Sequence, residues 1–293
     1  MSALRTALRA HWPEYLMEAA GLGLFMVSAG VFGTLLEYPG SPVRQAIEDP
    51  LARRAIMGAL MGLTAIALIY YPWGQQSGAH YNPATTLTFW RLGRVKSADA
   101  ALYVIAQFIG GALGVLAVTA ALGARFGAPP VSYVATLPGA SGAVVAFVAE
   151  VAIACVMMLM VLTCISSPRL MRHTGVFAGL LLAAYITFEA PVSGMSLNPA
   201  RSFASALPGG LWNAWWVYFT APPLGMLLAV ELRRLIRRRA HAGCAKLNHN
   251  TRRRCIFCGY GMPNSENRDP ETTATAETAR RAPASNSQPI RSA

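Results

Sequence analysis

Charged residues are scarce in this chain. Only 13% of its 293 residues are Asp, Glu, Lys or Arg, whereas 54% are hydrophobic. Soluble globular domains carry about 25% charged residues, and disordered chains contain few hydrophobic residues. The composition therefore excludes a soluble domain and indicates one multi-pass membrane domain with a soluble tail.

Motifs for active transport and for catalysis are also absent. The chain has no nucleotide-binding motif, and its glycine-rich stretch 108–114 indicates close helix packing. Within the apolar region His80 is the only candidate base, and no nucleophile or metal ligands accompany it. We therefore expect no enzyme activity and no cofactor, with an intramembrane enzyme as an alternative.

Six apolar runs are close to the roughly 20 residues that a helix needs to cross a bilayer. They are residues 14–36, 55–71, 100–122, 143–166, 174–190 and 213–232. No small-residue cleavage site follows the first run, so we expect it to remain as a signal anchor. The sequence predicts an integral, multi-pass membrane protein, in the plasma (inner) membrane.

Positive charge is distributed unequally between the predicted loops. If the six runs span, both termini and two of the loops share one face, and they hold all but five of the 25 Lys and Arg residues. Cytoplasmic loops are enriched in Lys and Arg, so both termini are predicted to be cytoplasmic. This topology explains most of the net charge of +12, and a nucleic-acid partner is unnecessary.

One short segment occurs twice. Residues 77–84 (Ser-Gly-Ala-His-Tyr-Asn-Pro-Ala) recur as residues 193–200 (Ser-Gly-Met-Ser-Leu-Asn-Pro-Ala). Asn before Pro is the N-cap and N1 order that starts a helix, and the runs that follow are too short to span. We expect an all-α fold with six transmembrane helices and two re-entrant half-helices in an inverted repeat of three plus three spans.

The inverted repeat brings both half-helix N-termini near the bilayer midplane. There Asn82 and Asn198 can donate hydrogen bonds to one water oxygen, so its protons point away and a proton wire is interrupted. The positive ends of both helix dipoles add a barrier to cations. Arg201 is the one cation expected at membrane depth, where a charge marks a pathway.

These features resemble the aquaporins, or major intrinsic proteins, as a bacterial-type member, over residues 14–232. The matching boxes are Asn82, Pro83 and Ala84, and Asn198, Pro199 and Ala200, with Arg201 after the second. The resemblance implies a passive channel for water and small neutral solutes such as glycerol in each subunit of a homotetramer. It leaves residues 1–13 as a cytoplasmic N-terminus and residues 233–293 as a cytoplasmic tail.

The resemblance also places a selectivity constriction. Its positions fall on Ile186, Met195, Arg201 and either Met61 or Gly62, because the connection before the first box makes the register ambiguous. This ring is wider and more apolar than that of strict water channels, which favours a neutral solute beside water. Four other positions resemble the water-conducting group instead, and they are Ser202, Ala206, Tyr218 and Phe219.

Three further polar residues lie near the boxes. Glu18 and Glu150 occupy equivalent places in the two halves, where they form a proton relay or accept hydrogen bonds from the backbone of the re-entrant loops. We favour the second role because of the repeat symmetry. His80 lines the path, gates with pH, or is a hydrogen-bonded wall residue.

The tail differs in composition from the rest of the chain. A cluster of Arg residues in 233–239 binds anionic lipid headgroups or acts as a topology signal, and residues from about 263 are expected to be disordered. Cys255 and Cys258 look like half of a zinc knuckle, which Cys244 and His249 could complete, but we favour reduced thiols over a metal site. A membrane-tethered regulatory protein acting through this tail is the alternative function.

Overall fold

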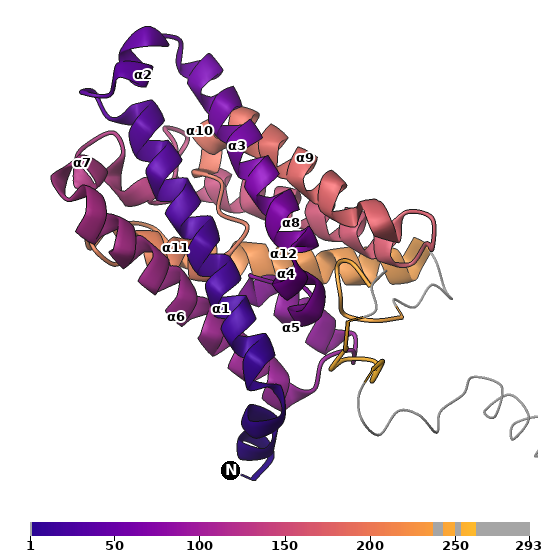
Figure 1. Ribbon diagram of the computed structural model, residues 1–293. Helices are drawn as coiled ribbons and strands as arrows, with labels where there is room; N and C mark the ends of the chain where they lie inside the picture. The colour runs from indigo at the N-terminus through magenta and orange to yellow at the C-terminus, as the bar shows by residue number, and fades with distance from the viewer. Residues whose placement is uncertain (1, 237–242, 250–252, 262–293) are drawn as a thin grey trace, which may run out of the picture.

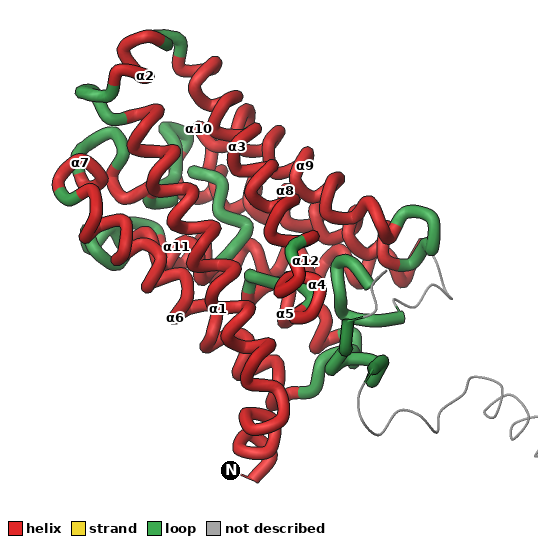
Figure 2. Tube along the Cα trace, viewed as in Figure 1, coloured by secondary structure: helices red, strands yellow, loops and turns green. Residues whose placement is uncertain are grey.

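The computed structural model describes residues 2–236, 243–249 and 253–261, and these contain helices and loops but no strand (Figures 1 and 2). Six long helices form the bundle. They are α1 (Ser2–Glu37), α3 (Pro50–Tyr70), α6 (Ser97–Leu122), α8 (Gly142–Ile165), α9 (Thr174–Phe188) and α12 (Trp215–Ile236). Helices α1 and α6 pack together, as do α3 with α9 and α8 with α12. The all-helical prediction is confirmed.

Four of these helices are long and apolar enough to cross a membrane, and so is α9 when the three residues before it are included (Met171–Phe188). The exception, α12, has 22 residues but contains Pro222 and Pro223, and its first turn holds two Trp residues that lower its hydropathy. Helix α1 starts at Ser2, so the helix begins before residue 14, where the predicted span starts. The segment before residue 14 continues the helix, and even Pro13 is accommodated within it.

The two predicted half-helices are present as α5 (Pro83–Arg91) and α11 (Pro199–Ala206). Each begins with Pro at N1 directly after an Asn N-cap, as the sequence predicts. Helix α5 packs against α6 and α12, and α11 packs against the same two helices. Each short helix therefore packs against one long helix of its own half and one of the other half.

Short helical turns connect the long helices. They are α2 (Pro42–Ala46), α4 (Pro72–Ser77), α7 (Ala124–Gly127), η1 (Ser132–Val134), η2 (Met171–His173) and α10 (Ala190–Ser193). Helices α4 and α10 precede the two boxes, and each ends at a glycine with positive φ, Gly78 at 100° and Gly194 at 83°. The same turn therefore leads the chain into both re-entrant loops.

Glycine allows the helices of the bundle to approach closely. A Cβ atom on Gly110 would lie 2.0 Å from the carbonyl oxygen of Ala19, and one on Gly114 would lie 2.4 Å from that of Gly23. The glycine-rich stretch of α6 thus packs against α1, which confirms the packing interpretation. Helices α3 and α9 meet in the same way at Gly62 and Gly179.

Candidate functional site

The two Asn side chains connect the two re-entrant loops to each other. Asn82 Nδ2 donates to the carbonyl oxygen of Leu197 at 2.8 Å, and Asn198 Nδ2 donates to that of Tyr81 at 2.8 Å. Each Oδ1 atom accepts from the first turn of its own half-helix, from Ala84 N at 2.8 Å and from Ala200 N at 3.0 Å. The two boxes thus meet at one point, with the symmetry of the repeat.

This arrangement leaves one donor free on each Asn side chain. A primary amide has two N–H donors, and each Asn uses one of them for the opposite loop. Both residues line the same cavity, which has a volume of about 150 Å³ and which we call the inner cavity. A molecule in that cavity therefore meets two amide donors that the loops hold in fixed positions.

Buried carboxylates fix both loops. Glu150 accepts from Ser196 N at 2.6 Å, Leu197 N at 2.8 Å and Ser193 Oγ at 2.8 Å. Glu18 accepts from the equivalent positions of the first loop, namely His80 N, Tyr81 N and Ser77 Oγ, and also from Gln107 Nε2. These contacts favour the loop-supporting role of both carboxylates over a proton relay.

Loss of one carboxylate should destabilise the fold. Glu150→Ala would leave two backbone N–H groups and one hydroxyl buried without an acceptor, each costing about 1–3 kcal/mol. We expect thermal unfolding in detergent at a clearly lower temperature. Glu231→Ala, on the exposed side of α12, is the control and should change stability by less than about 1 kcal/mol. Equal unfolding temperatures for both variants would contradict this role.

Two tyrosines complete the support of the loops. Tyr103 donates its hydroxyl to the carbonyl oxygen of Ser77 at 2.7 Å, and Tyr218 donates to that of Ser193 at 2.7 Å. Tyr103 was missed by the sequence analysis, and Tyr218 was considered only as a marker of selectivity. The repeat could have identified both tyrosines, because Tyr103 follows Ser77 by 26 residues and Tyr218 follows Ser193 by 25.

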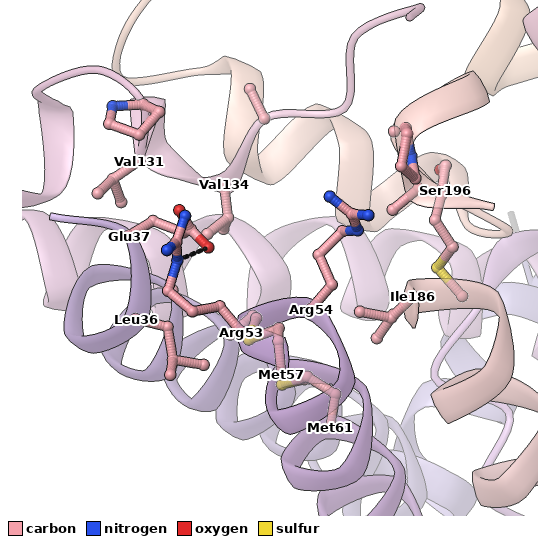
Figure 3. A pocket seen from close by; sticks show the side chains of 18 of the residues that line it. Leu36, Glu37, Arg53, Arg54, Met57, Met61, Val131, Val134, Ile186 and Ser196 are labelled. Carbon is pink, nitrogen blue, oxygen red and sulfur yellow. Dashed lines mark hydrogen bonds and ion pairs between the residues drawn. The ribbon is translucent and has the colours of Figure 1, made fainter. Parts of the chain in front are cut away.

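Two cavities lie on either side of Arg201. We call the one of about 560 Å³ the outer cavity, and in Figure 3 the side chains of Arg54, Met57 and Met61 from α3 and Ile186 from α9 extend into it. The inner one, of about 150 Å³, is lined by Asn82, Asn198 and His80 among others. Residues that border both cavities form the neck between them, and they are Phe25, Leu182, Ser196 and Arg201.

The predicted constriction residues lie at or just outside this neck. Arg201 borders both cavities, whereas Met61, Ile186 and Met195 line only the outer one. Gly62 lines neither cavity, since it packs against Gly179, so of the two alternatives Met61 is the wall residue. The sequence analysis missed three of the four neck residues, namely Phe25, Leu182 and Ser196.

Arg201 presents an unpaired donor. Its backbone N–H bonds to Asn198 Oδ1 at 3.2 Å, which places the residue in the first turn of α11. The side-chain Nη1 atom is buried and has no hydrogen-bond partner among the described residues. A buried donor without a partner beside a cavity is available to a passing molecule.

The four residues that resembled the water-conducting group lie away from both cavities. Ser202, Ala206, Tyr218 and Phe219 border a separate pocket of about 10 Å³. Ser202 Oγ is also within 2.6 Å of Thr136 Oγ1 and of Ser196 Oγ. These residues can therefore affect a molecule in the two cavities only through neighbouring residues, such as Ser196.

His80 is a buried wall residue whose two ring nitrogens both have partners. Nδ1 lies 3.1 Å from Thr86 Oγ1, and Nε2 lies 2.7 Å from the carbonyl oxygen of Ala245 in the tail. The ring also stacks between Phe89 and Phe257 of the tail, with centroid distances of 5.1 and 5.5 Å. The described part of the tail thus packs beside the inner cavity, whose wall includes Leu247.

The tail also brings the four suspected metal ligands together. The ligand atoms of Cys244, His249, Cys255 and Cys258 all lie within 4.8 Å of one another. The hydrogen bond with Cys244 lowers the pKa of the Cys255 thiol, and burial lowers the pKa of the neighbouring Lys246. The Arg residues at 237–239 and the expected disorder from about residue 263 lie outside the described residues.

Comparison with known proteins gives a consistent result. Residues 8–232 match the model of the family "Major intrinsic protein". The chain is 31% identical over 224 residues to a putative aquaporin NIP4-1 of Arabidopsis thaliana, covering 76% of this chain and 71% of that protein. It is 32% identical over 178 residues to a probable aquaporin NIP-type of Nicotiana alata, covering 60% of this chain and 63% of the relative. The X-ray structure of the aquaglyceroporin from Plasmodium falciparum has the same fold, with a TM-score of 0.60 at 17% identity over 76% of this chain and 95% of that one.

Proposed function

Because the chain belongs to the major intrinsic protein family, whose members are channels and not enzymes, we propose that it is a passive channel for water and small uncharged solutes such as glycerol that excludes ions and protons. One observation carries this proposal: Asn82 and Asn198 cross-link the two loops and keep one amide donor each for the inner cavity. The pathway then runs from the outer cavity through the neck to this pair.

Exclusion of ions and protons follows from the charges along the pathway. The N-termini of α5 and α11 meet at the Asn pair, so the positive ends of two helix dipoles face a cation there. Arg201 adds a full positive charge at the neck. A water molecule that accepts hydrogen bonds from both Asn side chains points its own protons away from them, so it interrupts the chain of waters that would carry a proton along the pathway.

Passage of a small neutral solute follows from the outer wall. Met61, Ile186 and Met195 are apolar, and Arg201 supplies an unpaired donor beside them. Glycerol has one carbon edge and one hydroxyl edge, so it matches such a wall. The residues that pointed to strict water conduction border a different pocket, and we therefore give them less weight.

We further propose the plasma membrane as the location, with both termini cytoplasmic. The start of α1 and the described tail lie at the same end of the molecule, because Arg254 of the tail binds Glu14 of α1 at 2.7 Å through both carboxylate oxygens. The lipid bilayer and three further copies of this chain, in a homotetramer, are the proposed partners. Nucleic acid is not among them.

Stopped-flow light scattering of proteoliposomes tests the proposal. The full chain is measured in chelator-containing buffer, because the Cys and His cluster lies beside the inner cavity. Separate water and glycerol gradients should both relax faster than in empty liposomes, and a proton-sensitive dye should report no added leak. Permeabilities equal to those of empty liposomes would overturn the channel.

A single substitution should separate solute from water. Ile186→His places a longer, polar side chain in the apolar wall of the outer cavity, next to the neck. We expect glycerol flux to fall several-fold more than water flux, since water needs less width. Phe188→His, on the same helix with a side chain 73% exposed, is the control and should change neither. Equal losses for water and glycerol would show that this wall does not select by size.

The alternative function, membrane-tethered regulation by the tail, has one observation in its favour. The described tail residues make specific contacts with the bundle, at Glu14, Gly78 and His80. These contacts lie at the inner end of the proposed pathway. If the tail is regulatory, these contacts place it where it would control conduction by this same channel.

A further inference from the structure

Two tail segments, residues 243–249 and 253–261, form a small module at the inner end of the pathway. Leu247 N donates to the carbonyl oxygen of Gly78 at 3.1 Å, and Ala245 accepts from His80. Arg254 binds Glu14, whose side chain is fully buried. Ala245, Lys246, Cys255 and Ile256 are themselves buried, although they belong to neither helix nor strand.

The module contributes to the wall of the inner cavity. Leu247 lines that cavity together with Asn82 and Asn198, so its side chain belongs to the wall of the pathway itself. Phe257 lies parallel to the His80 ring at 5.5 Å, with 5° between the planes. Ile256 packs against Tyr15 and Tyr103, the tyrosine that supports the first re-entrant loop. A molecule moving inward from the Asn pair therefore meets the tail.

The four ligand atoms lie close enough together to hold one metal ion. Zn–S bonds of about 2.3 Å and Zn–N bonds of about 2.0–2.1 Å place neighbouring ligand atoms about 3.3–3.8 Å apart. Here Cys244 Sγ and Cys255 Sγ are 3.3 Å apart, His249 Nε2 and Cys258 Sγ are 3.1 Å apart, and all four lie within 4.8 Å. Three sulfurs and one imidazole nitrogen are a set that selects zinc.

We propose that Cys244, His249, Cys255 and Cys258 bind one Zn²⁺ ion, and that this zinc-held tail is a plug that closes the inner end of the channel. The proposal rests on the proposed channel function. The three thiols bind as thiolates and release their protons to solvent, with no change of oxidation state. Zinc thereby joins the segment that carries Leu247 to the segment that carries Phe257 and Arg254.

Loss of zinc should open the channel. The module has no regular secondary structure of its own, so the metal supplies much of the free energy that folds it. Without the metal, the four ligands no longer hold the two segments together, and the hydrogen bond from Lys246 Nζ to the carbonyl oxygen of Arg254 is left between them. Leu247 then leaves the inner cavity, and the pathway past His80 opens.

The first experiment measures the metal. Purified full-length protein should contain one zinc per chain by elemental analysis, and Co²⁺ substitution should give the intense absorption of a tetrahedral thiolate site. Cys258→Ser should lose both signals. Cys155→Ser, which changes a buried cysteine of α8 outside the cluster, should keep both. Protein without bound zinc, or with a Cys244–Cys255 disulfide in its place, would overturn the metal site.

The second experiment measures flux in proteoliposomes of the full chain, zinc-loaded or treated with a chelator. We expect chelation to raise water permeability at least five-fold, and Cys258→Ser to be open under both conditions. Equal conduction with and without zinc would overturn the plug and leave the channel intact. No conduction in either state or in Cys258→Ser would overturn the channel function itself.

A third variant separates docking from metal binding. Arg254→Gln removes the charge that pairs with Glu14 but none of the four ligands. It should retain one zinc per chain and conduct even when zinc-loaded. Arg253→Gln, the adjacent exposed residue, is the control and should remain closed by zinc. A zinc-loaded Arg254→Gln channel that stays closed would show that the contact with Glu14 does not hold the plug.

Discussion

Replacing Leu182 with tryptophan is expected to reduce the water permeability of chelator-treated proteoliposomes at least ten-fold, to nearly that of empty liposomes. Leu182 borders both cavities, so its side chain lies at the neck between them. Tryptophan is much larger than leucine, and a closely packed bundle cannot move aside to make room for it. The added ring therefore fills the connection that the two cavities share.

The control uses the same substitution on the same helix. Leu180 is 60% exposed, on the side of α9 that faces away from the cavities, so Leu180→Trp should leave water permeability unchanged. Thermal unfolding of both variants shows whether each is folded. A folded Leu182→Trp protein with normal permeability would place the pathway elsewhere.

The centre of the site could be predicted because local sequence specifies it. Asn followed by Pro starts a helix wherever it occurs, and two copies in inverted halves require that the two starts meet. The carboxylates followed from the same symmetry, since a buried loop needs acceptors for its N–H groups. The structure gives Glu18 and Glu150 equivalent partners in the two loops.

The neck could not be predicted, because it depends on how distant helices are rotated against one another. Phe25 and Leu182 lie on α1 and α9, and nothing local distinguishes them from the many apolar residues that face lipid. The choice between Met61 and Gly62 could not be made from the sequence for a related reason. The length of the connection before the first box leaves the register of α3 open, and only its packing against α9 decides it.

The tail shows a further limit of sequence analysis. The four ligands could be suspected from residue type, but their spacing in the chain is irregular and says nothing about where the module lies. Its place is fixed by the Arg254–Glu14 pair and the Leu247–Gly78 bond, which join residues far apart in sequence. Long-range contacts of this kind have no local signature.

Arg201 should be the main barrier to cations, so its removal is expected to have a large effect. At about 5 Å from its guanidinium, a monovalent cation at the neck meets a repulsion of roughly 3 kcal/mol for an effective dielectric constant of about 20. Because about 1.4 kcal/mol corresponds to a factor of ten, Arg201→Ala should raise cation or proton permeability roughly 100-fold. The backbone N–H of residue 201 still bonds to Asn198, so the box keeps its cap.

A second arginine of the outer cavity provides the comparison that isolates the position of the charge. Arg54 lines the outer cavity, but it is not a neck residue, and its Nε atom donates to the carbonyl oxygen of Thr187 at 3.3 Å. Arg54→Ala removes the same charge and should leave the ion leak at the level of the unmodified protein. Proton flux is followed with a trapped pH-sensitive dye and sodium flux with a sodium-sensitive one. If both variants leak equally, net charge in the outer cavity and not the placement of Arg201 at the neck excludes ions. If neither leaks, the barrier lies at the Asn pair, where the N-termini of α5 and α11 meet.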